Sequence, residues 1–444
     1  MDYDARTGEE SASNIDEART IRKIFLHTVP LLMLLYFLSY LDRINVGFAA
    51  LTMNKDIGLT AYLYGWGAGI FFVGYFICEI PSNLLMEKFG ARRWFARILV
   101  TWGLLSCLMA FVQGEISFLV LRFFLGAAEA GFFPGVILYL TYWFPNRYRA
   151  RIVAAFIFAV PVSGALGAPI STWLLTLDGL HGLKGWQWLY LAEGLPAILA
   201  TFLVLRFITD KPSEAGWLTH SEKRWLTQQL ETDAANSSAA DKKTGLVHAL
   251  FSPTIIALAL IWFFNTGANL GLSFFLPQVI KLHGFSTQNV GWISGIPYVA
   301  GCFGMLLCGY LSDKFQAPRS LVVVPTILIC VGFAIAGFLP GSNVAIAGLA
   351  LAAIGILGAK GPFWVVCSAN MDKSTAAGAI AFVNAVGNLG GLVAPVVLGY
   401  LRDRSEDFSS GLYALSASAI ITLILIAIFL NRPERPSRTV AKTA

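Results

Sequence analysis

Four ionisable residues lie in two of the chain's long apolar stretches, Asp42 and Arg43 in one and Arg122 and Glu129 in the other. Arg122 and Glu129 are seven residues apart, about two helical turns, so they share one helix face. Asp42 and Arg43 diverge by about 100°, so we expect Arg43 to reach Glu129 while Asp42 approaches Arg122. Protonating one carboxylate of this neutral quartet would free an arginine for an incoming anion. These residue types therefore indicate proton–anion coupling, and the alternative is an ion network that only ties two helices together.

Lys360 is the single charge within the apolar stretches of the second half of the chain, and Trp364 follows it by one helical turn. We expect Lys360 to offer an anion a second cationic contact, with Trp364 on the same helix face. The alternative is that the lysine snorkels towards the lipid headgroups, as long basic side chains do.

Further polar side chains within the apolar stretches are candidates to line a substrate site. Two asparagine pairs are spaced by four residues, so the members of each pair share a helix face. The candidates are Tyr40, Tyr75, Asn265, Asn269, Gln278, Ser368, Asn384 and Asn388. The alternative is that these groups hydrogen-bond between helices.

The elements that must position these residues are membrane-spanning helices. The chain has 444 residues, of which 56% are hydrophobic and 13% charged, whereas soluble proteins have about 25% charged residues. A helix needs about 20 apolar residues to cross a bilayer. Twelve stretches meet this need, at 25–50, 62–86, 94–113, 116–140, 150–174, 187–208, 251–280, 289–312, 320–339, 343–368, 376–401 and 410–430. The composition excludes a soluble globule and predicts an all-α, multi-pass membrane protein.

The distribution of Lys and Arg predicts the orientation of the chain. Twelve crossings put both termini on one side, and the connections on the other side hold few basic residues, namely Lys55, Lys184, Lys281, Arg402 and Arg404. By the positive-inside rule both termini are cytoplasmic, and we expect the protein in the plasma membrane, the bacterial inner membrane. The net charge of +6 follows from this topology and predicts no nucleic-acid partner.

The second half of the chain repeats the first at an offset of 226 residues. Residues 85–93 align with 311–319, and residues 164–175 align with 390–401. Six stretches per half make the repeats parallel, which predicts two pseudo-symmetric six-helix bundles with a site between them. The expected parts are an N-terminal tail at 1–24, a bundle at 25–208, a cytoplasmic linker at 209–250, a second bundle at 251–430 and a C-terminal tail at 431–444.

Glycines recur at four-residue spacing in these stretches, among them Gly65 and Gly69. Because glycine lets two backbones approach closely, this spacing predicts tight helix–helix packing.

Residues 83–93, Asn-Leu-Leu-Met-Glu-Lys-Phe-Gly-Ala-Arg-Arg, resemble the loop motif G-x-L-x-D-R-x-G-R-R of the major facilitator superfamily. Asn83 replaces Gly and Glu87 replaces Asp. Residues 41–48, 122–130 and 185–194 are similar to the anion:cation symporter branch, which includes permeases for tartrate, hydroxyphenylacetate, sugar acids and phthalate. The resemblance covers essentially the whole chain and implies the major facilitator fold.

The resemblance also implies roles for the four central charges. In these symporters the carboxylates matching Asp42 and Glu129 couple protons, and the arginines matching Arg43 and Arg122 tune them or meet the substrate.

Roles outside that quartet are implied as well. Tyr75 and Asn384 resemble positions that touch substrate in sugar-acid symporters. The two loop motifs resemble gates whose salt bridges stabilise the outward-facing state, and their residues are Glu87, Arg92, Arg93, Asp313, Lys314 and Arg319.

Together these features predict a proton-coupled symporter that imports a small organic anion by alternating access. The anion is a mono- or dicarboxylate such as a tartrate-like acid, a sugar acid or an aromatic acid. The alternatives are a proton-driven exporter, an uncoupled anion exchanger or facilitator, and a transport-inactive nutrient receptor. Exporters of the superfamily usually carry G-x-x-x-G-P-x-x-G-G in the fifth stretch, which residues 159–169 do not match.

Histidine and cysteine spacing argues against other chemistry. The five histidines and six cysteines have no metal-binding spacing, and no phosphate-binding loop is present. We therefore expect no metal, no cofactor and no enzymatic activity, and partners limited to the anion, protons and the lipid bilayer. We expect a monomer.

Overall fold

The computed structural model describes residues 16–238, 250–315, 317–371, 376–405 and 407–430. Within these residues, twelve helical segments are long and apolar enough to cross a membrane. Each overlaps one of the twelve apolar stretches, so the predicted number and order of crossings are confirmed. Helices suit this setting because a helix satisfies its own backbone hydrogen bonds where no water is present.

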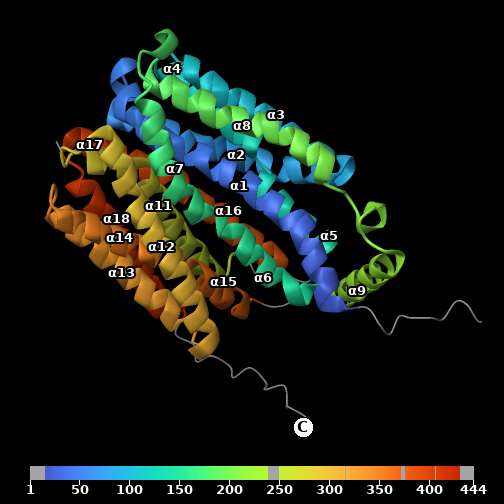
Figure 1. Ribbon diagram of the computed structural model, residues 1–444. Coiled ribbons are helices and arrows are strands. Elements are labelled where there is room, and N and C mark those ends of the chain that lie inside the picture. Colours follow the sequence, from blue (N-terminus) through green and yellow to red (C-terminus); the bar gives the residue numbers. More distant parts are fainter. Residues whose placement is uncertain (1–15, 239–249, 316, 372–375, 406, 431–444) are drawn as a thin grey trace, which may run out of the picture.

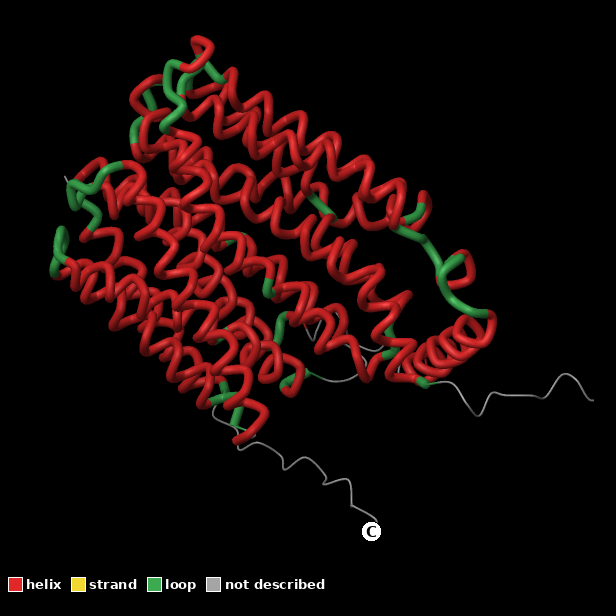
Figure 2. The backbone as a smooth tube through the Cα atoms, viewed as in Figure 1, coloured by secondary structure: helices red, strands yellow, loops and turns green. Residues whose placement is uncertain are grey.

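The helices form two bundles, coloured blue to green and yellow to red along the sequence in Figure 1. Figure 2 shows the same view with every helix in red and the loops in green. The first bundle contains α1 (Glu17–Asp56), α2 (Ala61–Phe89), α3 (Ala91–Leu108), α4 (Glu115–Glu129), α5 (Phe132–Trp143), α6 (Asn146–Ile157), α7 (Ala159–Leu175) and α8 (Gly185–Phe207). The second contains α11 (Pro253–Lys281), α12 (Thr287–Phe315), α13 (Ser320–Phe338), α14 (Asn343–Gly358), α15 (Lys360–Ala369), α16 (Ala376–Asn388), α17 (Gly390–Arg404) and α18 (Ser409–Phe429). Helix α9 (His220–Ser238) lies between them in the sequence, and single 3-10 turns occur at Met109–Phe111, Leu180–Gly182 and Pro212–Glu214.

The fourth and fifth crossings of each bundle are broken, although the sequence predicted continuous spans. The breaks fall between α4 and α5, α6 and α7, α14 and α15, and α16 and α17. At the first break Ala130 is non-helical and Gly131 has a φ of 85°, a value that glycine adopts at little cost. The Ser82 hydroxyl donates 2.7 Å to the carbonyl oxygen of Ala130, which satisfies a backbone group that the break frees.

Helix α1 begins about two turns before the apolar stretch expected at residue 25. The Asp16 side chain accepts a hydrogen bond of 3.0 Å from the backbone N–H of Arg19 and so caps the helix at Glu17. Helix α1 therefore extends through the polar residues that precede the apolar stretch.

The linker packs on the first bundle, at the end of the molecule where α1 begins, which we name the proximal face. Lys23 of α1 forms an ion pair of 2.8 Å with Glu222 of α9. Partial burial alone would raise the pKa of Glu222, but hydrogen bonds from Lys23 and Thr219 lower it below its usual value. The His27 ring stacks on Trp217 at 4.3 Å. Figure 1 shows α9 beside the start of α1.

The two bundles join at the opposite end, the distal face, where α1 ends and α2 begins. The Tyr64 hydroxyl of α2 donates 2.8 Å to the carbonyl oxygen of Phe274 in α11. The Asp403 carboxylate of α17 accepts from the backbone N–H groups of Ala61 and Tyr62 at 3.0 and 2.8 Å. An acid at a helix start is favourable because it meets unpaired N–H groups. These bonds close the distal face.

Glycines allow α2 and α17 to approach closely near the distal face. A Cβ atom at Gly65 would lie 2.3 Å from the carbonyl oxygen of Pro395, and one at Gly69 would lie 2.7 Å from that of Leu392. Only glycine fits at these separations, so the tight packing predicted from the spacing is confirmed.

We predict that Gly65→Leu holds the distal ends of α2 and α17 apart, because overpacking costs about 1–3 kcal/mol. The Tyr62 and Tyr400 rings lie 6.0 Å apart at this contact. Cross-linking of a Tyr62→Cys/Tyr400→Cys pair, with the native cysteines replaced, should fall at least about fivefold, which corresponds to about 1 kcal/mol.

The matched control is Gly309→Leu in α12, where an added Cβ meets no atom within 4 Å. It should leave the cross-linking unchanged. Equal cross-linking in Gly65→Leu would show that the glycine contact does not hold the distal face closed.

Candidate functional site

Arg43 of α1 and Glu129, the last residue of α4, form an ion pair through Nη2 and Oε1. The Ser39 hydroxyl, one helical turn before Arg43, donates 2.7 Å to the same Oε1. The Glu129 side chain is 2% exposed and that of Arg43 is 13% exposed. The predicted Arg43–Glu129 pairing is confirmed. The carboxylate is buried, while its arginine remains partly accessible.

Aromatic rings of α2 surround the guanidinium groups. The Arg43 guanidinium lies 5.5 Å from the Tyr75 ring and 5.4 Å from the Phe71 ring, and that of Arg122 lies 5.0 Å from Phe71. Such cation–π contacts strengthen when water is excluded. Phe71 therefore contacts both arginines, a role that the sequence analysis missed. Its four-residue spacing from Tyr75 is the signal that could have identified it.

Arg122 of α4 is completely buried but only partly bonded. Its Nε donates 3.0 Å to the carbonyl oxygen of Gly67. Its Nη1 and Nη2 have no hydrogen-bond partner among the described residues. A buried cation with unused donors is costly.

Asp42 forms no ion pair with Arg122 within 4.0 Å among the described residues, although the two charges are near enough to interact electrostatically. Asp42 accepts hydrogen bonds from Asn45 at 2.8 Å and from Trp102 and Ser106 of α3. Three donors already satisfy the carboxylate and hold it against α3. The four-residue spacing of Trp102 and Ser106 in the third apolar stretch is the signal that the sequence analysis did not use.

Predicted residues of the two bundles meet at Tyr40 and Asn269. The Asn269 amide of α11 donates 3.2 Å to the Tyr40 hydroxyl of α1. Asn265, one turn earlier in α11, donates 3.4 Å to the Ile356 carbonyl oxygen and so binds within its own bundle. Gln278 lies farther along α11, beside Tyr64 near the distal face.

Lys360 is the first residue of α15, directly after the break that follows α14. Its side chain is partly exposed and has no carboxylate within 4.0 Å among the described residues. Trp364 packs against Trp262 of α11, with ring centres 5.0 Å apart. Lys360 is therefore a cation without an acidic partner in the described part of the chain.

The remaining predicted polar residues lie on α15 and α16. The exposed Ser368 donates to the carbonyl oxygen of Val365 in its own helix at 3.0 Å. Asn384 and Asn388 are partly buried on α16. The structure does not bring these three residues to the Arg43–Glu129 pair through any hydrogen bond between described residues.

The first of the two loop motifs, at residues 83–93, bonds to α8 and to Asp210, which follows α8 closely. The backbone N–H of Arg92 donates 2.7 Å to Asp210, and its side chain donates to the Leu205 carbonyl oxygen. The other motif residues lie at or near the surface: Glu87, Arg93, Asp313, Lys314 and Arg319. Hydrogen bonds between the two bundles are present at the distal face and between Tyr40 and Asn269.

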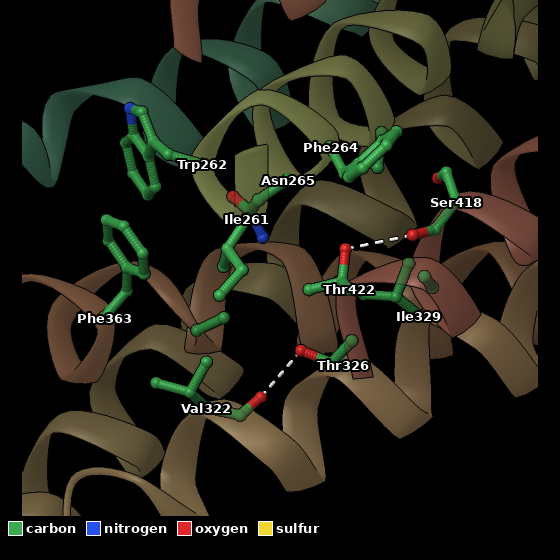
Figure 3. Close-up of a pocket in the computed structure, with 13 residues that line it drawn as sticks. Ile261, Trp262, Phe264, Asn265, Val322, Thr326, Ile329, Phe363, Ser418 and Thr422 are labelled. Carbon is green, nitrogen blue, oxygen red and sulfur yellow. Dashed lines mark hydrogen bonds between the residues drawn. The ribbon is translucent and has the colours of Figure 1, made fainter. Parts of the chain in front are cut away.

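A small pocket lies among α11, α13, α15 and α18, inside the second bundle (Figure 3). Its hydroxyls bond to their own helices, Thr326 to Val322 at 2.7 Å and Thr422 to Ser418 at 3.0 Å. Of the predicted residues, only Asn265 lines it. A mainly hydrocarbon pocket does not suit an anion.

Two six-helix bundles that join at one face, with paired charges buried at mid-span, define a polytopic membrane transporter with two halves. The Major Facilitator Superfamily model matches residues 32–395. The chain belongs to the Major Facilitator Superfamily, as the loop motif indicated.

Similar proteins match nearly the whole chain. A protein named "Putative tartrate transporter" from Agrobacterium vitis is 44% identical over 92% of each chain. A protein named "Quinolone resistance transporter" from Acinetobacter baumannii is 38% identical over 94% of this chain and 96% of its own. The inward open xylose transporter XylE from E. coli has a TM-score of 0.74 at 16% identity, covering 94% of this chain and 98% of that one, which shows the shared fold.

We predict that Arg43→Met lowers the free energy of unfolding by about 3–5 kcal/mol, because Glu129 is left buried without its cation. The double variant Arg43→Met/Glu129→Gln should recover most of this loss, since neither charge then remains. Unfolding of the purified protein in detergent measures both effects. A double variant that loses the sum of the two single losses would contradict an energetic pairing of these side chains.

Proposed function

We propose that the protein is a proton-coupled symporter that imports a small organic anion by alternating access. The observation that carries this proposal is the ion pair between the partly exposed Arg43 and the buried Glu129. Of the two side chains, only the Glu129 carboxylate can lose its charge by accepting a proton, and that change would release Arg43.

The proposed cycle exchanges one negative partner of Arg43 for another. Protonation of Glu129 removes its charge and leaves its contact with Ser39. Arg43 is then a cation without its anion in a low-dielectric setting, which is unfavourable until a carboxylate of the substrate binds. A guanidinium can bind a carboxylate with two parallel hydrogen bonds. Proton and anion therefore favour each other's binding, which is the requirement for coupled transport.

Other cations and polar groups extend the proposed anion site. Arg122 retains two nitrogens without partners, and Lys360 has no carboxylate nearby in the described part of the chain. Tyr40 and Asn269 connect the two bundles at one hydrogen bond. A dicarboxylate would use one carboxylate at Arg43 and a second cation for the other. The relative named for tartrate supports this substrate class.

The arrangement described is closed at the distal face. By the positive-inside rule, the proximal face and both termini are cytoplasmic, and the protein lies in the plasma membrane. The closed distal face then corresponds to the inward-facing half of the cycle. The bonds of Arg92 to Asp210 and to the Leu205 carbonyl oxygen, outside the second bundle, support this state for the first loop motif.

Export of drugs by proton antiport is the second candidate, and the relative named for quinolone resistance favours it. The fifth span lacks the glycine- and proline-containing motif typical of exporters. A direct transport assay separates the two directions.

The test is uptake by the purified protein in liposomes with an imposed inward proton gradient and a panel of tartrate, sugar acids and aromatic acids. Wild type should accumulate one class of acid only with the gradient. Glu129→Gln should abolish accumulation but retain exchange of labelled for unlabelled acid, because the variant still binds anion. Glu115→Gln, an exposed acid at the start of the same helix, is the matched control.

If the acid equilibrates across the membrane without the proton gradient in both wild type and Glu129→Gln, that result would contradict proton coupling. Proton-driven movement of quinolones, with no acid accumulated, would support the exporter instead.

We further predict that Lys360→Met raises the transport KM for a dicarboxylate at least about tenfold, the effect of losing one charged hydrogen bond of about 1.5 kcal/mol. The KM for a monocarboxylate should change much less. Lys360→Arg should restore part of the affinity because it keeps the charge. An unchanged KM for both acids, at normal protein abundance, would assign Lys360 to the lipid headgroups.

A further inference from the structure

Arg97 of α3 is a cation within a membrane-spanning helix that has no role in the proposed cycle. Its side chain is half-buried, and it forms no ion pair with any described residue. Its Nε is buried and has no hydrogen-bond partner in the described part of the chain. A cation within a span is costly unless a partner, an anion or water meets it. The guanidinium therefore retains donors with which it can bind an anion.

Trp94 holds the Arg97 side chain towards the proximal face. The guanidinium lies 4.0 Å from the centre of the Trp94 ring, which is one turn nearer to the start of α3. The Trp94 Nε1 donates 3.0 Å to the Ser82 hydroxyl of α2, and the ring stacks on that of Phe89 at 6.0 Å. Long basic side chains reach the lipid headgroups in this way, while their stems pack on apolar surface. Tryptophan is typical of the same boundary.

Arg97 belongs to a stripe of side chains on α3, which lies on the side of the first bundle away from the second (Figure 1). Arg93, one turn earlier, is exposed and also forms no ion pair with a described residue. Leu104 and Leu108, two and three turns later, are 51% and 47% exposed. Helical spacing places all four side chains on one face. Exposed leucines on a membrane-spanning helix face lipid, so the stripe presents two cations to the headgroups and an apolar surface to the acyl chains.

The charge and shape of this stripe fit a phospholipid with a net negative charge. A guanidinium binds a phosphate through two parallel hydrogen bonds. The proximal face is the cytoplasmic one by the positive-inside rule, and the cytoplasmic leaflet carries anionic lipids. A free anion would use the two arginines alone, whereas a lipid also covers the leucines.

We propose that Arg93 and Arg97 bind the phosphate of an anionic phospholipid in the proximal leaflet, and that one of its acyl chains lies along Leu104 and Leu108. The bound lipid supplies the negative charge that Arg97 lacks within the described protein. The site lies outside the proposed transport path.

The test titrates the unfolding temperature of the purified full-length protein in an uncharged detergent, because a ligand that binds the folded state raises this temperature. The probes are phosphatidylglycerol, phosphatidylcholine with the same acyl chains, and inorganic phosphate. Wild type should bind phosphatidylglycerol with an apparent Kd at least about tenfold lower than that for phosphatidylcholine, in which the choline cation balances the phosphate. Tenfold corresponds to about 1.4 kcal/mol.

Arg97→Gln should raise the Kd for phosphatidylglycerol at least about tenfold and leave that for phosphatidylcholine nearly unchanged. Arg97→Lys should keep part of the affinity, because it keeps the charge but loses the planar fork. Arg224→Gln removes an exposed arginine from α9 at the same face, and this matched control should bind like wild type. If Arg97→Gln does not fold, Arg93→Gln decides, and it should weaken phosphatidylglycerol binding in the same way.

Wild-type affinity for phosphatidylglycerol in both Arg97→Gln and Arg93→Gln would overturn the proposal, as would equal affinity of wild type for the two lipids. Equal stabilisation by inorganic phosphate would overturn the lipid as the occupant, because the leucines would then contribute nothing. The assay involves no transport, so its outcome is independent of the proposed symport.

Discussion

A charge in the hydrocarbon core of a membrane requires a partner, and the Arg43–Glu129 pair meets this constraint between α1 and α4. The chain reaches this geometry because α4 ends at Glu129 and turns at Gly131, where φ is positive. Ser82 satisfies the carbonyl that the turn exposes. The break, the charge and the hydrogen bond are therefore parts of one local arrangement.

The two bundles share a repeat but differ in chemistry. The repeat offset places Ala268, Asn269, Gly348 and Gly355 where the first bundle has its four central charges. Within the predicted apolar stretches, the second bundle contributes polar side chains and Lys360, while Asp42 and Glu129 belong to the first bundle. Under the proposed cycle, one bundle holds the proton machinery, and relative movement of the bundles changes which side reaches it.

The sequence predicted the twelve crossings and the family because long apolar runs and loop motifs are local signals. It also predicted the ion pair between Arg43 and Glu129, because helical spacing places these side chains on helix faces that can meet. It did not predict the hydrogen bonds of Asp42 to α3, because the positions of those donors depend on how the helices pack. The breaks in four spans were missed for a similar reason, because apolar runs continue through them. The contact of Phe71 with two guanidiniums depends on packing that composition does not encode.

The central claim is that an anion and a proton replace the internal ion pair together. The most direct measurement is proton uptake by the detergent-solubilised protein in weakly buffered solution near neutral pH, as the transported acid is added. The account predicts that binding raises the pH of the medium in wild type and leaves it unchanged in Glu129→Gln. Saturable binding of the acid to wild type with no change in pH would contradict the account.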